Sequence, residues 1–485
     1  MTVKGMHTSP LKADTLNPKV LTAQYAVRGE IVIRAGEIQE ELAVGEKKPF
    51  SNILYCNIGN PQQLGQLPVT FFRQVLALCD YPPLLESPRV GELFPPDVVE
   101  RARRYLNAIP GGTGAYSDSR GAGILRQEVA KGIERRDGYP ADPDLIYMSD
   151  GASQSVHAVM RALIRDERDA VLVPIPQYPL YSATLALYGG TLLPYYLKEE
   201  HEWGLDLQEL HDQTEKAKAE GKTVRALVVI NPGNPTGQVL TQENQKDILK
   251  FCRDEGVVLA ADEVYQDNIY SPNKKFVSFK KVMREMGLED VALASMHSIS
   301  KGFYGECGRR GGYTEFVGFD KDVLAQLYKL ASINLCSNVN GQICTALMMQ
   351  PPKEGEPSYL LYSKERSELL ASLKRRAERL HKALSELQGV TCNPLEGALY
   401  AMPRIHLPPG AIQAAKEAGK APDFFYCKQL LEETGIVTVP GSGFKQEEGT
   451  YHFRTTILVQ EKETDQVIDR LKKFHDGFME KYGRK

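Results

Sequence analysis

Five short apolar runs recur between residues 145 and 300, and each is followed by a loop and then by a stretch with helical spacing. Strands that are apolar on both faces and alternate with helices are typical of a parallel sheet covered by helices on both sides. This alternation predicts an α/β protein with a mainly parallel central sheet. The runs are LIYM (145–148), AVLVPI (170–175), ALVVI (226–230), VVLAA (257–261) and VALASM (291–296).

Helical spacing and one clear break organise the rest of the chain. Apolar residues from Val156 to Leu163 keep helical spacing, so a helix follows the first strand directly. After the break PPKEGEPS (351–358), amphipathic helices are indicated from Leu369 to Leu387 and from Val467 to Phe478. We expect a large α/β domain and a smaller α+β domain built from the chain ends. The expected units are an N-terminal arm (1–60), a segment connecting to the small domain (61–100), the large domain (101–360) and the C-terminal small domain (361–485).

Composition excludes several classes of protein. The net charge of −3 offers no basic excess for a nucleic-acid partner. No uncharged apolar run approaches the ~18 residues of a membrane-spanning helix. The eight cysteines are dispersed, without a CxxC pair or a histidine spaced for zinc, so we expect reduced thiols and no metal. The N-terminus lacks the apolar core of a secretory signal, and we expect a cytoplasmic protein, although an organellar form without its transit peptide would look the same.

Polar and glycine-rich segments follow the predicted strands, at the edge where parallel sheets bind ligands. SDGASQ (149–154) opens a helix, where free backbone N–H groups and the helix dipole favour a phosphate; an ordinary helix cap is the alternative. NPGNPTG (231–237) presents two asparagine amides on a backbone that two prolines and two glycines restrict, which goes beyond a plain turn. The sequence therefore predicts a ligand site at this edge.

Three charged residues belong to the same edge. Asp262 follows an apolar strand, and its burial needs a cation, either of a ligand or of an Arg or Lys within the fold. Lys301 lies between Ser300 and Gly302, where it is either a solvated loop lysine or an amine that forms a Schiff base. Arg454 lies in a strand-like run, where a partly buried guanidinium favours a bidentate pair with a carboxylate.

In combination, these motifs resemble the fold-type I pyridoxal-phosphate (PLP) aminotransferases over nearly the whole chain. NPGNPTG, DEVY, and SISKG followed by GRRGGY are highly specific when they occur together. Three longer stretches are similar, more narrowly, to eukaryotic alanine aminotransferases, with glutamate:glyoxylate aminotransferases as near relatives. They are SMHSISKGFYGECGRRGGY, ADEVYQDN and PIPQYPLYSATLALYGG.

The resemblance implies catalytic roles for four residues. Lys301 would hold PLP covalently and, once its amine is released, would move a proton to and from the substrate Cα. Asp262 would face the pyridine nitrogen and keep it protonated, so that the ring can accept electrons. Asn234 and Tyr265 would hydrogen-bond the ring oxygen.

The resemblance also implies how the rest of the cofactor is held. Tyr178 would stack on the pyridine ring, unless it is a core tyrosine. An arginine would bind the phosphate: the GxRxGY spacing selects Arg310, whereas counting from the lysine selects Arg309, and we expect Arg310. The other expected phosphate ligands are Ala152, Ser153, Gln154 and Ser298.

Substrate and partner residues complete the expectation. Arg454 would bind the substrate α-carboxylate, assisted by the Gly59 backbone and by Asn234, which fixes the Cα–H bond relative to the ring. Tyr116 would reach the phosphate of a partner subunit, which implies a homodimer with shared active sites. A second arginine for a side-chain carboxylate is not evident, so the sequence does not explain how 2-oxoglutarate is bound.

The expected reaction is L-alanine plus 2-oxoglutarate to pyruvate plus L-glutamate by a ping-pong route. Glutamate:glyoxylate exchange is the nearest alternative, and a PLP-dependent lyase of the aminocyclopropane-carboxylate synthase type shares the same lysine, acid and arginine. A PLP-binding regulator of DNA would need an added basic helix-turn-helix, which neither the charge nor the length provides.

Overall fold

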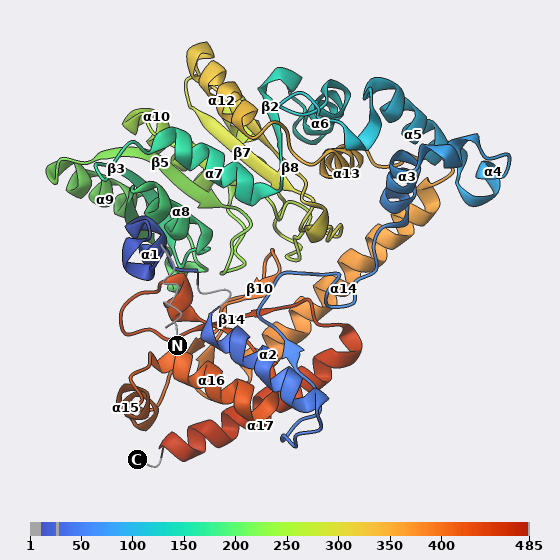
Figure 1. Cartoon of the computed structure of the whole chain (residues 1–485). Helices are drawn as coiled ribbons and strands as arrows, with labels where there is room; N and C mark the ends of the chain where they lie inside the picture. Colours follow the sequence, from blue (N-terminus) through green and yellow to red (C-terminus); the bar gives the residue numbers. More distant parts are fainter. Residues whose placement is uncertain (1–10, 26–28, 484–485) are drawn as a thin grey trace, which may run out of the picture.

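The computed structural model describes residues 11–25 and 29–483. A seven-stranded sheet forms the centre of the large domain, drawn in the upper part of Figure 1, with the order β2-β8-β7-β6-β5-β3-β4. Strands β3 to β7 are mutually parallel, and β8 runs antiparallel to both of its neighbours. The predicted mainly parallel sheet is therefore confirmed. The strands are β2 (Ile146–Ser149), β3 (Asp169–Ile175), β4 (Thr191–Tyr196), β5 (Thr223–Ile230), β6 (Val258–Asp262), β7 (Leu293–Ser298) and β8 (Gly312–Val317).

Helices cover both faces of this sheet, because successive strand residues enter two different cores. Val171 and Val228 pack on one face, whereas Leu172 and Val229 pack on the other. Local signals set the helix ends: the Thr241 side chain caps the start of α10, which stops at Gly256 with a φ of 65°. One face carries α7 (Ala152–Leu163), α8 (Leu180–Tyr188) and α12 (Lys321–Ile333); the other carries α9 (Leu207–Ala219), α10 (Gln242–Glu255) and α11 (Phe279–Glu285).

A separate helical core lies beside the β2 edge of the sheet. It includes most of the segment 61–100 that we expected to lead to the small domain, because α3 packs against α5 and α13. The expected boundary at 100/101 falls inside α5, whose residues Val98, Ala102 and Tyr105 share one buried face. The helices of this region are α3 (Thr70–Asp80), α4 (Val90–Leu93), α5 (Pro96–Ala108), α6 (Gly123–Asp137) and α13 (Val339–Met349).

The small domain lies below the sheet in Figure 1 and draws on both chain ends. Part of the expected arm belongs to its core, since Ile31, Ala35 and Ile38 of α2 are buried there. The expected boundary at 360/361 falls inside α14, which runs from one domain to the other. Its helices are α2 (Glu30–Ala43), α14 (Tyr359–Ser385), α15 (Pro409–Glu417), α16 (Pro422–Thr434) and α17 (Glu461–Gly483). Its strands are β1 (Leu54–Tyr55), β9 (Val390–Thr391), β10 (Tyr400–Ala401), β11 (Arg404–Ile405), β12 (Ile436–Val437), β13 (Val439–Pro440) and β14 (Phe453–Thr456).

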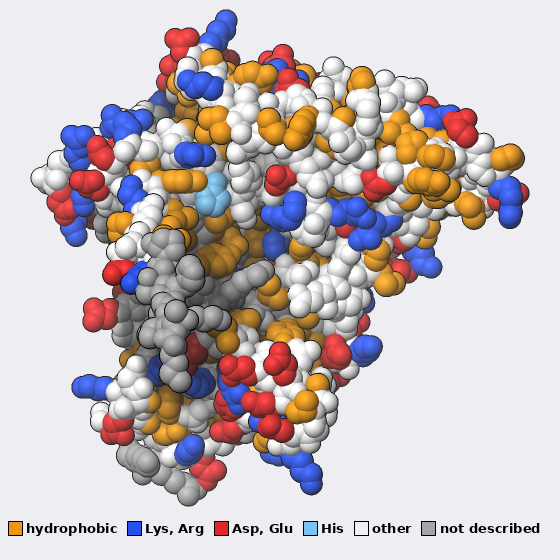
Figure 2. Space-filling model, in the orientation of Figure 1, with side chains coloured by type: hydrophobic (Ala, Val, Ile, Leu, Met, Phe, Trp, Pro, Cys, Tyr) orange, Lys and Arg blue, Asp and Glu red, His pale blue; other side chains and the backbone are white. Residues whose placement is uncertain are grey.

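The short helix α1 (Pro18–Thr22) packs against α8 of the large domain, so the chain passes from one domain to the other between α1 and α2. In the view of Figure 2, Lys and Arg side chains are mixed with Asp and Glu over both domains. None of the helices in the described part of the chain is long and apolar enough to cross a membrane.

Candidate active site

A cavity of about 410 Å³ lies beyond the carboxyl ends of β5, β6 and β7, where residues of both domains meet. Eleven of the residues expected at the site line it. They are Gly59, Ala152, Ser153, Tyr178, Asn234, Asp262, Tyr265, Ser298, Lys301, Arg310 and Arg454. The spacing of motifs at strand ends thus converges on one cavity.

Lys301 enters the cavity from the loop after β7. The loop is closed by backbone hydrogen bonds, from Ile299 N to Gly311 O at 3.1 Å and from Glu306 N to Ile299 O at 3.0 Å. Lys301 Nζ donates a hydrogen bond of 2.8 Å to the carbonyl oxygen of Gly59. The amine is therefore directed into the cavity from a fixed backbone.

Asp262 is the last residue of β6, and its side chain is buried. Tyr181 donates a 2.8 Å hydrogen bond to Asp262 Oδ2, whereas Oδ1 has no partner among the described residues. Burial raises the pKa of Asp262 to about 6, against the lowering effects of Tyr181 and of the Lys301 charge. A buried carboxylate oxygen without a donor, in the wall of a cavity, fits a ligand that brings an N–H group, as a protonated pyridine does.

Arg454 on β14 is one of the largest fully buried side chains. Its Nη1 donates to Asn234 Oδ1 at 3.1 Å and its Nη2 to the carbonyl of Asn57, while Nε has no partner within the described chain. Within residues 11–25 and 29–483, its hydrogen-bond acceptors are thus an amide oxygen and a backbone carbonyl, and not a carboxylate. A buried guanidinium without a carboxylate fits an anionic ligand that supplies one.

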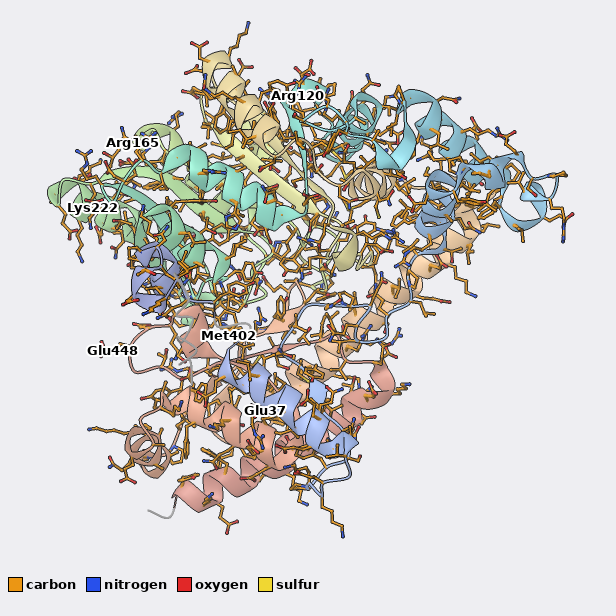
Figure 3. The ribbon with its side chains drawn as sticks, viewed as in Figure 1. Glu37, Arg120, Arg165, Lys222, Met402 and Glu448 are labelled. Atoms are coloured by element: carbon orange, nitrogen blue, oxygen red, sulfur yellow. The ribbon has the colours of Figure 1, made fainter. Side chains whose placement is uncertain are left out.

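Aromatic rings hold this guanidinium in place. Its central carbon lies 4.1 Å from the ring centroid of Tyr400 and 4.7 Å from that of Phe444. Phe444 packs in turn with Trp203 and Met402, and Figure 3 shows Met402 at the junction of the two domains. The orientation of Arg454 therefore depends on packing between the domains.

The phosphate end is built by the start of α7 and by Arg310. Gly151 precedes the helix with a φ of 82°, and an added Cβ there would lie 2.5 Å from Arg310 Nη2. Arg310 Nη1 and Nη2 donate to the carbonyls of Cys307 and Asp150, at 2.9 and 2.8 Å. Arg309 turns away from this cavity to pair with Glu306 at 3.5 Å. Helix N–H groups, a serine and a guanidinium fit a phosphate here.

Two expected residues do not line the cavity. The side chain of Gln154 belongs to a second cavity of about 320 Å³, between α7 and α12. Tyr116 lies on the surface with an exposed fraction of 77%.

Two tyrosines of the cavity were not expected. The Tyr25 hydroxyl lies 2.8 Å from the Tyr178 hydroxyl, and the two rings meet edge to face. Tyr400 of β10 lines the cavity next to Arg454. A short aromatic strand after a glycine, in EGALYA (396–401), was the available signal for Tyr400; nothing distinguishes Tyr25 in the sequence. No group of three or more His, Cys, Asp or Glu side chains in the described ranges is placed to hold a metal ion.

Comparison with known proteins places the chain among relatives of high similarity. The family described as aminotransferase class I and II matches residues 76–471. Alanine aminotransferase 1, mitochondrial, of Arabidopsis thaliana is 58% identical over 477 residues, which cover 98% of this chain and 88% of that protein. Glutamate–glyoxylate aminotransferase 1 of the same plant is 53% identical over 480 residues, 98% of both chains. Among solved structures, an alanine aminotransferase from Pyrococcus furiosus has a TM-score of 0.75 at 23% identity and covers 95% of this chain and 100% of that chain, which supports the fold.

Proposed function

The chain belongs to the class I and II aminotransferases, PLP-dependent enzymes of fold-type I, and from this premise we propose that it exchanges the amino groups of L-alanine and 2-oxoglutarate. The products are pyruvate and L-glutamate, released by a ping-pong route. The higher identity to a plant alanine aminotransferase, 58% against 53% for the glutamate–glyoxylate enzyme, supports this choice of substrates.

One observation carries the assignment of chemistry: an amine, a buried carboxylate oxygen without a hydrogen-bond partner and a guanidinium without a carboxylate partner face one cavity. We assign Asp262 Oδ1 to the pyridine nitrogen, Arg454 to the substrate α-carboxylate and Arg310 with the start of α7 to the phosphate. PLP, when bound, supplies an electron-withdrawing ring that stabilises negative charge at the substrate Cα.

The residues of the protein supply proton transfer and substrate orientation. Lys301 Nζ takes the proton from the Cα of the donor amino acid in one half-reaction and gives a proton to the Cα of the product amino acid in the other, a role that is typically worth about 10²–10⁴-fold in rate. Arg454 and the Gly59 backbone hold the substrate so that the Cα–H bond faces this amine. Tyr178 would cover one side of the cofactor ring, and Asn234 and Tyr265 would hydrogen-bond its ring oxygen.

We further assign the enzyme to a homodimer in which Tyr116 completes the partner's phosphate site. The exposure of Tyr116, together with that of Ile333 and Leu335, supports a contact surface in this region. The plant relative at 58% identity is named mitochondrial, so an organellar location stands beside the cytoplasmic one.

Two measurements test the proposal. Borohydride reduction of the yellow holoenzyme should fix the cofactor on Lys301, and a label found on another lysine would remove the site assignment. Steady-state assays with alanine plus 2-oxoglutarate, and with glutamate plus glyoxylate, decide the substrates. A higher kcat/KM for glutamate and glyoxylate would favour the second candidate, to which the 53% identical relative points.

A further inference from the structure

The hydroxyl of Tyr400 faces the same small volume as the catalytic amine. Tyr400 is 3% exposed and reaches the cavity from β10 of the small domain, whereas Lys301 reaches it from the large domain. A Cβ added to Gly59 would overlap the Tyr400 hydroxyl oxygen and would lie 3.0 Å from Lys301 Nζ. The two polar atoms are thus neighbours on the open side of Gly59.

The ring of Tyr400 is fixed by its surroundings. The Arg454 guanidinium lies over one face at 4.1 Å, and the Tyr265 ring meets it edge to face at 6.2 Å and 84°. Burial acts to raise the pKa of Tyr400, but the positive charges of Lys301 and Arg454 and a hydrogen bond from Tyr265 outweigh it and lower the pKa. The positive charge of Lys301 therefore acts on the Tyr400 hydroxyl.

A lysine ammonium has three donors, and Gly59 O accepts one of them. A phenol hydroxyl can pair with the lysine in both of its states, since it donates to a neutral amine and accepts from an ammonium. Hydrogen bonds to a charged group are about twice as strong as neutral ones. A neighbouring phenol can therefore hold the amine in place whether the amine is neutral or protonated.

We propose that Tyr400 is a positioning residue for Lys301: its hydroxyl orients the lysine amine within the cavity. In the proton transfer the Cα–H bond breaks, its electron pair stays on carbon and the proton goes to Nζ, while Tyr400 keeps its own proton. This inference rests on the proposed aminotransferase reaction for its consequence in turnover, but the position of both polar atoms beside Gly59 is a property of the chain without cofactor.

The groups that face this pair come from several elements. They are Asp262 at the end of β6, Cys307 in the loop after β7, Arg454 on β14 and Tyr265 after β6. All of them remain when Tyr400 is replaced by phenylalanine, so a change in the behaviour of Lys301 reports on the lost hydroxyl. Tyr426→Phe is the matched control, because Tyr426 is a fully buried tyrosine of the same small-domain core whose hydroxyl contacts His475 at 2.9 Å.

The first test uses cofactor-free protein and competitive acetylation with acetic anhydride, followed by peptide mapping of Lys301 across a range of pH. In Tyr400→Phe the acetylation rate of Lys301, relative to that of the other lysines of the same protein, should rise about threefold, because the amine loses a hydrogen-bond partner that holds it. The Tyr426→Phe control should keep the wild-type rate. An unchanged relative rate in folded Tyr400→Phe would overturn the proposal.

The second test uses the holoenzyme and the half-reaction with L-alanine. Tyr400→Phe should slow it about tenfold and increase the Cα-deuterium isotope effect, with the KM for alanine changed less than about twofold. A loss confined to KM, with an unchanged isotope effect, would mean that the ring only packs beneath Arg454. If wild type fails to use alanine, the proposed substrate is wrong, and the acetylation curve still decides the role of Tyr400.

A folding defect in Tyr400→Phe would be seen by circular dichroism. In that case 4-methylphenylalanine at position 400 preserves the shape of the side chain and removes only the hydroxyl. The relative acetylation rate of Lys301 should then change in the same direction as for phenylalanine. An unchanged rate would again contradict the proposal.

Discussion

The amine of Lys301 donates a hydrogen bond of 2.8 Å to the carbonyl oxygen of Gly59, which lies 242 residues earlier in the chain. Gly59 follows β1 of the small domain and Lys301 follows β7 of the large domain, so this contact spans the cavity. The acceptor is a backbone atom, and the space where a side chain would stand is taken by the Tyr400 hydroxyl and by Lys301 Nζ. The active site therefore leaves no room for a side chain at position 59.

Gly59→Ala should lower kcat/KM for alanine by about 10²-fold, because the methyl group displaces the amine and the tyrosine hydroxyl from their places. Gly36→Ala is the control, since an added Cβ at this position of α2 meets nothing within 4 Å. That control should keep wild-type kinetics and gain up to about 1 kcal/mol in the free energy of unfolding. Near-normal kinetics for Gly59→Ala would mean that the bound enzyme opens at this point.

Asp262→Asn should stabilise the cofactor-free protein at neutral pH. Burial raises the pKa of Asp262 to about 6 from its ordinary value of 3.8, so the folded state binds a proton that the unfolded state has released between these values. The free energy of unfolding of wild type is therefore reduced as pH rises from about 4 to about 6. The amide variant lacks this effect and should be more stable above pH 6 by about 1–3 kcal/mol, with no difference near pH 3.

Urea unfolding of the two cofactor-free proteins at pH 3.5 and pH 7 measures this difference. Equal stability at pH 7 would mean that the carboxylate is neutralised by a cation of the protein. In the holoenzyme the same substitution should slow the half-reaction with alanine far more than it weakens cofactor binding, because an amide cannot hold the proton of the pyridine nitrogen.

The sheet could be predicted from the sequence to the extent that its strands are buried on both faces. Those strands appear as apolar runs, and the five runs correspond to β2, β3, β5, β6 and β7. The edge strand β4 was missed, since it is half exposed and contains Pro194. The central strand β8 was missed because it carries Glu315, whose charge is met by the buried Lys280.

The site residues that follow strands were predictable, because parallel strands end at one edge and their loops meet there. Contacts that depend on how the small domain packs against the large domain could not be predicted from the sequence. Tyr400 lies in a two-residue strand without periodicity, and its approach to Lys301 follows from the return of the chain through α14. The contact of Tyr25 with Tyr178 could not be predicted either, because the two residues are 153 positions apart and α1, which precedes Tyr25, packs on α8 of the large domain.

The two adjacent arginines offer a matched pair of substitutions. Arg310→Ala should weaken PLP binding about 10–100-fold, because Arg310 lines the cavity beside the start of α7. Arg309→Ala should bind PLP as wild type does, because Arg309 pairs with Glu306 outside this cavity. Fluorescence titration of the cofactor-free proteins measures both affinities. The reverse order of the two effects would move the phosphate assignment to Arg309.

The shared active site can be tested by mixing subunits. If Tyr116 serves the partner's phosphate, neither subunit has a complete site, and the exposed Tyr116 ring becomes part of the interface. We would combine subunits that carry Tyr116→Phe and Lys301→Ala with wild-type subunits, so that only the wild-type lysine supports turnover. In the mixed dimer the cofactor on that lysine faces the phenylalanine of its partner. Its PLP affinity should fall to that of a Tyr116→Phe homodimer, whereas an affinity equal to wild type would place Tyr116 in the site of its own chain.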